Sequence, residues 1–206
     1  VCQIMLDRAF GASGSRIVIE ECMTGPEASL LLFTDGESFR TLPAAMDHKR
    51  AKDGDRGLNT GGMGVIAPNP YVTPEVYRRC VDEIIVPVLA AMKAEGRPFR
   101  GCLFAGLMIT EAGPKVIEFN CRFGDPEAQA LLALLESDLL SILMATRNGT
   151  LAQTEVRFRE GASCCVVLAS GGYPEAYQKG YPIQGLSDDL GARVDCAGVG
   201  ASEEGL

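Results

Sequence analysis

The sequence is poor in the residues that build zinc sites, because it has a single histidine, His48, and no Cys-x-x-Cys pair. Zinc-binding domains need clustered cysteine and histidine ligands, so we do not expect a zinc site. No apolar run is long enough to span a bilayer, and no basic-then-apolar leader opens the chain. We therefore predict no membrane segment and a cytoplasmic protein. The first residue is Val1 rather than methionine, which leads us to expect that the chain starts inside a longer one.

Basic residues are also in short supply, with 19 Lys and Arg against 27 Asp and Glu and a formal net charge of -8. This balance argues against non-specific binding to nucleic acid or anionic membranes, although a local basic groove could still hold phosphates. With 206 residues, 47% of them hydrophobic, the chain can bury a core of one or two domains. Its eight cysteines lie mostly in apolar segments and are expected to be buried thiols.

The most informative stretch runs from Lys115 to Glu127 and reads KVIEFNCRFGDPE. Alternate residues of a strand point to opposite faces, so Glu118, Asn120 and Arg122 are predicted to share one face, and Ile117, Phe119 and Cys121 an apolar one. A carboxylate beside an amide oxygen suits Mg2+, whose remaining positions are left to water and phosphates. The same pattern is also typical of a half-buried strand whose polar face only meets water.

The end of this stretch predicts a turn into a helix. Gly124 permits a sharp turn, Asp125 can cap the helix, and Pro126 and Glu127 suit its first turn. Arg122, just before the turn, suits an oxyanion or a phosphate.

The run EFNCRFGDPE, residues 118–127, resembles the metal-binding strand of the phosphoribosylamine–glycine ligase family (glycinamide ribonucleotide synthetases), which are ATP-grasp ligases of purine synthesis. The resemblance implies an α+β fold, with residues 1–150 forming the second ATP-grasp lobe, an antiparallel sheet with packed helices. Residues 151–206 then resemble the start of a small, mostly β carboxyl-terminal domain that is cut short. It implies ATP and Mg2+ or Mn2+ as ligands, with Glu118 and Asn120 holding the metal.

The amino-terminal part predicts an antiparallel meander. Residues 17–22 and 27–34 are rich in β-branched and apolar residues, and Asp35-Gly36 suits a tight turn into residues 39–42. By itself this pattern favours a purely structural sheet. The family resemblance implies that the backbone around Glu20, Glu21 and Met23 contacts adenine, and that Glu27 accepts from the ribose hydroxyls.

Residues 44–68 contain DHKR and NTGGMG, are rich in glycine and charge, and are long for a structural connection. Consecutive glycines can turn backbone N–H groups toward an anion, and Lys49 adds positive charge, but a flexible linker has a similar composition. The resemblance to the ligase family extends through this stretch, except that Met46 replaces the glutamine common in the family. It implies that Asp47, His48 and Asp125 orient glycine or the amine, although His48 could also simply hydrogen-bond the loop.

The remaining elements are predicted from the spacing of apolar residues and from residues that begin or interrupt helices and strands. Thr73 should cap a helix with apolar residues at intervals of four, and Pro87 should kink it. Residues 102–110 and 115–120 should pair as a hairpin, 125–135 and 138–147 should be helices, and 163–169 a buried strand.

The resemblance implies the ligation of glycine to 5-phosphoribosylamine with ATP through a glycyl phosphate, with Arg122 and Lys49 neutralising the charge that develops. Family members are longer, so we expect the amino-terminal domain, the first ATP-grasp lobe and the end of the last domain to be absent, and the chain alone to be inactive. We expect small-molecule partners only, and a monomer or weak dimer. The alternatives are another ATP-grasp carboxylate–amine ligase and a non-catalytic nucleotide-binding module.

Overall fold

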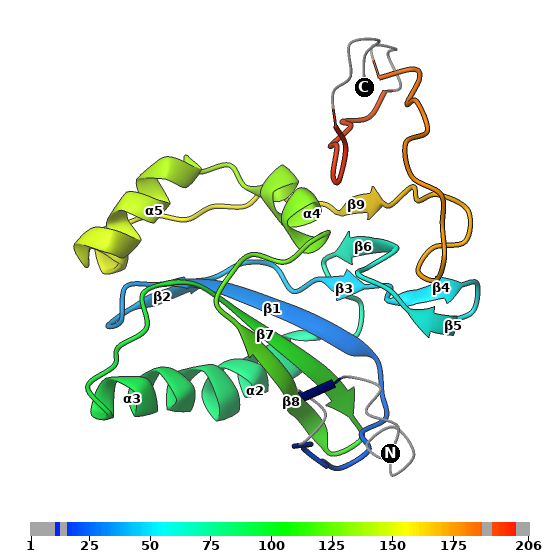
Figure 1. The fold of residues 1–206 in the computed structure, drawn as a ribbon. Helices are drawn as coiled ribbons and strands as arrows, with labels where there is room; N and C mark the ends of the chain where they lie inside the picture. Colours follow the sequence, from blue (N-terminus) through cyan, green and yellow to red (C-terminus); the bar gives the residue numbers. More distant parts are fainter. Residues whose placement is uncertain (1–10, 13–15, 187–190, 201–206) are drawn as a thin grey trace.

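A four-stranded antiparallel sheet in the order β2-β1-β7-β8 forms the centre of the computed structural model, which describes residues 11–12, 16–186 and 191–200. Its strands are β1 (Glu27–Thr34), β2 (Phe39–Thr41), β7 (Gly101–Thr110) and β8 (Gly113–Asn120). Figure 1 shows α2 (Pro74–Arg79) and α3 (Val86–Ala94) along one face of this sheet, and α4 (Glu127–Leu134) and α5 (Leu139–Asn148) over the other. The predicted antiparallel sheet with packed helices is confirmed.

Strand β1 is buried on both faces, which explains its continuous apolar sequence. Leu30 and Leu32 pack into the layer under the helix that contains α2 and α3. Leu31 and Phe33 point to the opposite layer, under α4 and α5. Because side chains alternate along a strand, a strand covered by helices on both faces must be apolar at successive positions.

The predicted meander is only partly correct. The hairpin of β1 and β2 is present, with Leu32 opposite Thr41. Residues 17–22, predicted as a further strand, have no strand structure. Their β-branched side chains stay exposed, with Val18 at 83% and Ile19 at 80%, so they gain no packing against the sheet that would favour a strand.

The long helix after Thr73 begins as predicted, because the Thr73 side chain accepts a hydrogen bond from the Val76 N–H. Between α2 and α3 it widens into a π-helical turn, η2 (Cys80–Ile85), in which the Val86 N–H bonds to the Val81 carbonyl. Pro87 has no N–H to donate, and a π turn just before it accommodates the lost bond.

Residues 44–68, predicted as one long loop, instead contain four short strands. These are β3 (Met46–Asp47), β4 (Arg50–Lys52), β5 (Arg56–Asn59) and β6 (Gly64–Ala67). Strands β4 and β5 form a hairpin, whereas β6 lies between β3 and β9 (Ser163–Val166) in a second sheet. The loop prediction was wrong because short strands surrounded by glycine and charge carry no apolar alternation that a sequence pattern could show.

The region after α5 contributes little regular structure to the described residues. Asp138 caps α5 by accepting from the Ser141 N–H, and Gly149 ends the helix in the left-handed conformation. A short 3-10 helix, η3 (Leu151–Gln153), follows, and β9 then joins β6. The proposed domain division at residue 150 stays a prediction, and the last residues, 201–206, lie outside the described part.

No helix in the described part of the chain is long and apolar enough to cross a membrane.

Candidate functional site

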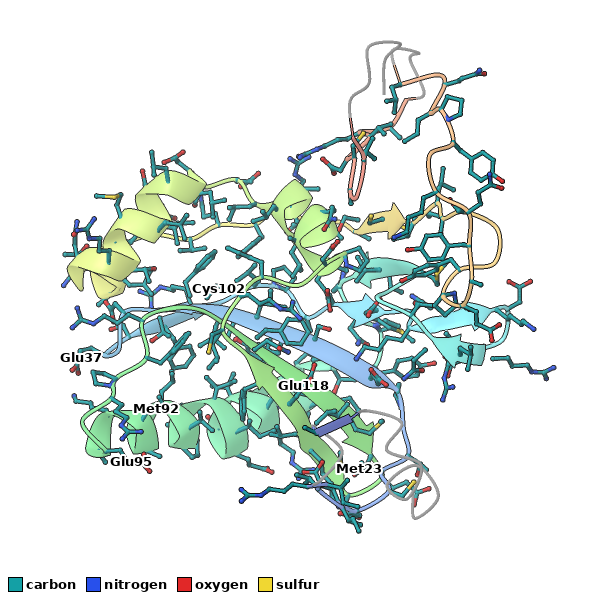
Figure 2. The ribbon with its side chains drawn as sticks, viewed as in Figure 1. Met23, Glu37, Met92, Glu95, Cys102 and Glu118 are labelled. Atoms are coloured by element: carbon teal, nitrogen blue, oxygen red, sulfur yellow. The ribbon has the colours of Figure 1, made fainter. Side chains whose placement is uncertain are left out.

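The predicted metal ligands lie side by side on β8. The Asn120 amide donates to Glu118 Oε1 over 3.0 Å. Figure 2 shows Glu118 on the β7–β8 hairpin, where its carboxylate is exposed. Gly106 of β7 pairs with Glu118 of β8, and the register of the two strands shifts between Gly106 and Leu107 in a β-bulge. A bulge changes the direction in which nearby side chains point, and in β8 it lies just before Glu118 and Asn120.

The predicted apolar face of β8 is wrong at this end of the strand. Phe119 is 37% exposed and Cys121 is also exposed. Val116, before the bulge, does pack against the core layer under α2 and α3. Strand β8 is the edge of the sheet, so both of its faces near Phe119 can meet solvent.

Lys49 brings a positive charge to the same place. Its ammonium lies 2.8 Å from Glu27 Oε2, and both side chains are about two-thirds buried. Burial alone lowers the pKa of Lys49, but the contact with Glu27 and the charges of Asp47 and Glu118 outweigh it and raise the pKa above 10.5. Lys49 is therefore a cation held among the carboxyl groups of Glu27, Asp47 and Glu118. We call these four residues the Lys49 cluster.

Asp47 is the most perturbed acid of the site. It is 9% exposed, and its Oδ1 has no hydrogen-bond partner. Burial first, and then the charge of Glu127, raise the pKa of Asp47, Lys49 partly opposes the rise, and the resulting pKa is about 7. A buried carboxyl near a second carboxylate disfavours its own ionised form, so Asp47 exchanges its proton close to neutral pH.

Glu127 was predicted only as a helix-starting residue, but it belongs to the site. It is 3% exposed, and Ser29 Oγ donates to its Oε1 over 2.8 Å. Gly124 leaves the room it needs, because a Cβ at Gly124 would collide with the Glu127 carboxylate. The only sequence signal for this contact is Ser29 beside the apolar residues of β1, and a serine by itself does not indicate its partner.

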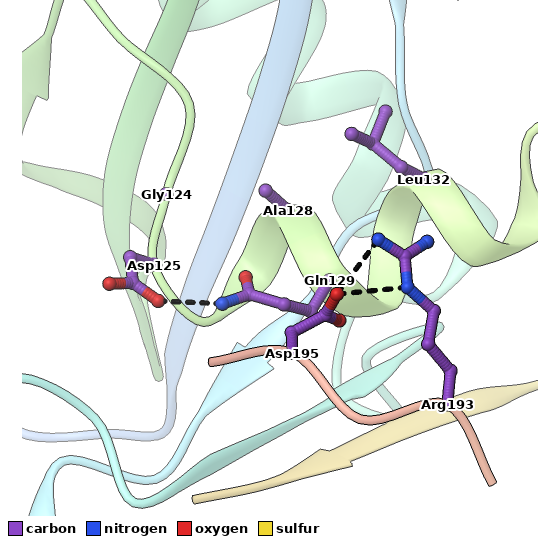
Figure 3. A pocket seen from close by; sticks show the side chains of 7 residues that line it. All are labelled: Gly124, Asp125, Ala128, Gln129, Leu132, Arg193 and Asp195. Atoms are coloured by element: carbon purple, nitrogen blue, oxygen red, sulfur yellow. Dashed lines mark hydrogen bonds and ion pairs between the residues drawn. The ribbon is translucent and has the colours of Figure 1, made fainter. Parts of the chain in front are cut away.

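Asp125 does not cap α4. The N-cap residue is Pro126, and the Asp125 carboxylate instead accepts from the Gln129 side chain over 2.8 Å. Figure 3 shows this pair facing the Arg193–Asp195 ion pair across a cavity of about 370 Å3, whose apolar wall includes Leu132. Asp125 therefore lies beside the segment that carries Arg193 and Asp195.

His48 and Arg122 are both exposed, and their side chains are not bound to the cluster. The backbone of His48 ties β3 to β6, since its N–H donates to the Gly64 carbonyl and its carbonyl accepts from the Met63 N–H. Arg122 follows the end of β8, and its guanidinium donates to the Phe123 carbonyl over 2.8 Å. Their proposed roles stay predictions.

The predicted adenine-contacting residues lie before β1. Lys115 on β8 pairs with Glu21, with the two charged groups 2.7 Å apart, so this segment runs beside the hairpin, where Figure 2 also places Met23. In the described part of the chain, the backbone of residues 17–24, which includes Glu20, makes no hydrogen bond.

The glycine-rich loop does not present its N–H groups to an anion in this structure. Its amides already have partners: Gly61 bonds to the Tyr173 hydroxyl, Gly62 to Thr60 Oγ1 and Met63 to the His48 carbonyl. The loop therefore serves to hold the cluster together in the form described.

The donor set fits a hard divalent cation. Glu118 and Asn120 supply oxygen-bearing groups in contact, and rotation of the amide about its own axis brings its oxygen beside the carboxylate. Among the described residues no group of three or more His, Cys, Asp and Glu is placed to hold a metal. A cation held here would thus need phosphate and water to complete its coordination.

Comparison with known proteins places this geometry in a family. Residues 1–128, more than half of the chain, match the family described as phosphoribosylglycinamide synthetase, ATP-grasp (A) domain. The chain belongs to this family. Phosphoribosylamine–glycine ligase of Rhodopirellula baltica is 51% identical over 185 residues, which are 89% of this chain and 42% of that protein. The enzyme of the same name from Caulobacter vibrioides is 49% identical, over 97% of this chain and 47% of that protein.

Solved structures agree with the phosphoribosylglycinamide synthetase fold. Phosphoribosylamine–glycine ligase of Thermotoga maritima superposes with a TM-score of 0.70 at 35% identity, covering 78% of this chain and 40% of that one. A biotin carboxylase domain of a thermophilic 2-oxoglutarate carboxylase shares the fold alone, with a TM-score of 0.53 at 17% identity, over 79% of this chain and 36% of that one. The chain spans less than half the length of these relatives, and its fold is an ATP-grasp fragment.

Proposed function

We propose that this chain is the part of a phosphoribosylamine–glycine ligase that carries the metal-binding strand β8 and the Lys49 cluster. The reaction joins glycine to 5-phosphoribosylamine, converts ATP to ADP and phosphate, and yields glycinamide ribonucleotide. The observation that carries the proposal is the identity of about half of the residues to curated ligases of this name, over nearly the whole chain. The adjacency of Glu118 and Asn120 supports it.

The chemistry requires one anion to attack another. A glycine carboxylate oxygen attacks the γ-phosphorus of ATP and ADP leaves; the amine nitrogen then attacks the acyl carbon and phosphate leaves. Glu118 and Asn120 would hold Mg2+ or Mn2+, which neutralises and orients the phosphates. Lys49, held among carboxylates, and the exposed Arg122 are the residues proposed to stabilise charge that develops during transfer.

Acidic residues of the site are proposed to orient the amine and to exchange a proton with it. Asp47 has a pKa of about 7, so it can hold or release a proton near neutral pH. We assign Asp47, His48 and Asp125 to orienting glycine or the amine. We assign the adenine to the segment of Glu20, Glu21 and Met23, whose backbone groups are unbonded within the described residues.

Glu27 is the proposed partner of the ribose hydroxyls, and the structure adds a condition to that role. Its carboxylate is already paired with Lys49 at 2.8 Å. A carboxylate has lone pairs for several donors, so Glu27 can accept from a hydroxyl while it keeps Lys49. Contact with both would link the nucleoside end of ATP to the cation near its phosphates.

A chimera tests the proposal, since the relatives carry more than half of their length outside the matched region. The matched 185 residues of the Rhodopirellula baltica enzyme are replaced by this chain. We expect ADP release that requires both glycine and 5-phosphoribosylamine, and a product with the mass of glycinamide ribonucleotide. A folded chimera that uses another carboxylate or amine instead would overturn the assignment in favour of a different ATP-grasp ligase.

Matched variants of the chimera test the site. Glu118→Gln keeps the shape but removes the charge, and we expect ADP release to fall about 100-fold. Glu111→Gln, on the exposed turn of the same hairpin, is the control and should retain full activity. Magnesium-dependent nucleotide binding that is unchanged in both Glu118→Ala and Asn120→Ala would instead favour a non-catalytic nucleotide-binding module.

The remaining proposals concern the chain by itself. We propose that the chain alone does not catalyse ligation, because the relatives are more than twice as long as the region matched. We place the protein in the cytoplasm, in keeping with the free thiols of all seven cysteines that the structure describes. We also propose that it is a monomer or weak dimer that acts on small molecules, without nucleic acid or membrane partners.

A further inference from the structure

Tyr173 contacts the glycine-rich loop from a distant part of the chain. The Gly61 N–H donates to the Tyr173 hydroxyl over 3.0 Å, across 112 positions in sequence. The fit is close, because a Cβ at Gly61 would lie 3.3 Å from that hydroxyl. No prediction from sequence assigned a role to this tyrosine.

Within the described residues, the rest of the loop is bonded to itself, to its neighbouring strands and, through the Met63 carbonyl, to the Val167 N–H just after β9. Thr60 donates to the Lys49 carbonyl through both its N–H and its hydroxyl, at 2.7 and 2.8 Å. Gly62 donates to Thr60 Oγ1, and Met63 donates to the His48 carbonyl. Gly61 is the exposed tip, and among the described residues its amide alone in this turn is held by a remote side chain.

The loop covers the buried face of Asp47. Gly62 is buried with φ +118°, and a Cβ there would lie 2.8 Å from Asp47 Oδ1 and 2.5 Å from Pro126. The unpartnered Asp47 oxygen is therefore closed off from water by Gly62 and Pro126. A small displacement of Gly62 would hydrate that oxygen.

Tyr173 is itself fixed by its surroundings. Its ring packs edge-to-face against Tyr177, with centroids 5.6 Å apart, and the Lys179 ammonium lies 5.7 Å from the Tyr177 ring centre. The turn beneath it is tight, since the Tyr173 N–H bonds to the Ser170 carbonyl. A fixed hydroxyl can act as a fixed acceptor for the loop.

We propose that Tyr173 is a positioning residue whose hydroxyl holds the Gly61–Gly62 turn over Asp47. Its meaning for catalysis rests on the proposed function, because Asp47 is there assigned to the amine or glycine. In this way the segment after β9 takes part in the site without touching the reacting atoms.

The charged groups that face Asp47 come from three elements: Glu127 on α4, Glu27 on β1, and Lys49 beside β3. The backbone N–H of His48, which donates to the Gly64 carbonyl, also lowers the pKa of Asp47. None of these is altered by a change at Tyr173. A change in the titration midpoint of Asp47 in a Tyr173 variant would therefore show that Gly62 shields the Asp47 carboxyl from water less completely.

The test uses Tyr173→Phe in the whole 206-residue chain, with Tyr177→Phe as the matched control. Both substitutions remove one hydroxyl and keep the paired rings, but no hydrogen bond of the Tyr177 hydroxyl to the described residues is present. We expect the Gly61 amide in Tyr173→Phe to exchange with solvent about fivefold faster or more. The carbon-13 titration midpoint of the Asp47 carboxyl should fall by about half a pH unit or more as water enters.

Amide exchange in β1 and β7 should stay unchanged in both variants, which shows that the fold is intact. An unchanged Gly61 exchange rate and Asp47 midpoint in Tyr173→Phe, or equal changes in Tyr177→Phe, would overturn the positioning role. Neither measurement depends on catalysis. If the chimera is inactive but Tyr173→Phe changes the Gly61 exchange rate and the Asp47 midpoint, the proposed function fails and the positioning role stands. If the chimera is active but neither value changes, the positioning role of Tyr173 fails and the proposed function stands.

Discussion

Replacing Asp47 by asparagine should stabilise the protein at alkaline pH and leave it nearly unchanged at acid pH. Asp47 is buried, its Oδ1 has no partner, and its pKa in the folded chain is raised from 3.8 to about 7 by burial and then by Glu127. In the unfolded chain the same carboxyl ionises at its ordinary value. Between these two values the unfolded state binds fewer protons, so raising the pH favours unfolding.

The size of the effect follows from the two pKa values. The difference between about 7 and 3.8, at about 1.4 kcal/mol for each tenfold change in proton affinity, amounts to about 4 kcal/mol. The stability is fully present below the unfolded value and is lost as the pH passes through the folded one. Of the total, about 3 kcal/mol should be lost between pH 5 and pH 8.

The assay is urea unfolding, followed by circular dichroism, of the wild-type chain and Asp47→Asn at both pH values. The free-energy difference between variant and wild type should grow by about 3 kcal/mol from pH 5 to pH 8 in favour of the variant. Asp53→Asn, at an exposed position, controls for the loss of one negative charge from an acidic chain. A difference for Asp47→Asn that is the same at both pH values would refute the reasoning that the buried carboxyl resists ionisation.

Two further variants test contacts that fix the elements around the site. Ser29→Ala leaves the buried Glu127 carboxylate without its 2.8 Å donor and should lower the free energy of unfolding by about 1–3 kcal/mol; unchanged urea midpoints would show that water replaces the hydroxyl. Asp138→Ala removes the cap of α5 and should cost about 1 kcal/mol, whereas Asp138→Asn should restore most of it. Equal losses in both Asp138 variants would indicate a role for the charge rather than for the cap.

Several elements were predictable because their signals are local. The caps of the helices at Thr73 and Asp138 depend on side-chain oxygens that bond to an N–H three residues away. The hairpin of β7 and β8 depends on two apolar runs with a turn between them. The contact between Glu118 and Asn120 follows from the two-residue period of a strand.

Other features depended on partners that lie far away in sequence. Residues 17–22 do not form the expected strand, because their side chains stay exposed and gain no packing against the sheet. Phe119 is 37% exposed because β8 is an edge strand. From its sequence position Glu127 was predicted to be a helix-starting residue. In the fold it is 3% exposed and accepts a 2.8 Å hydrogen bond from Ser29 Oγ, 98 positions away.

The order of the residues alone therefore determined which residues are neighbours along a strand or helix and which of them begin and end the helices. Local periods and caps act within a few positions, so they can be derived without knowing the fold. Only the tertiary structure decided that Asp47 lies near Glu127 and under Gly62, and that Lys49 bonds to Glu27. Burial and the fields of distant charges set the proton affinity of Asp47, and both exist only once the sheets and α4 have packed together.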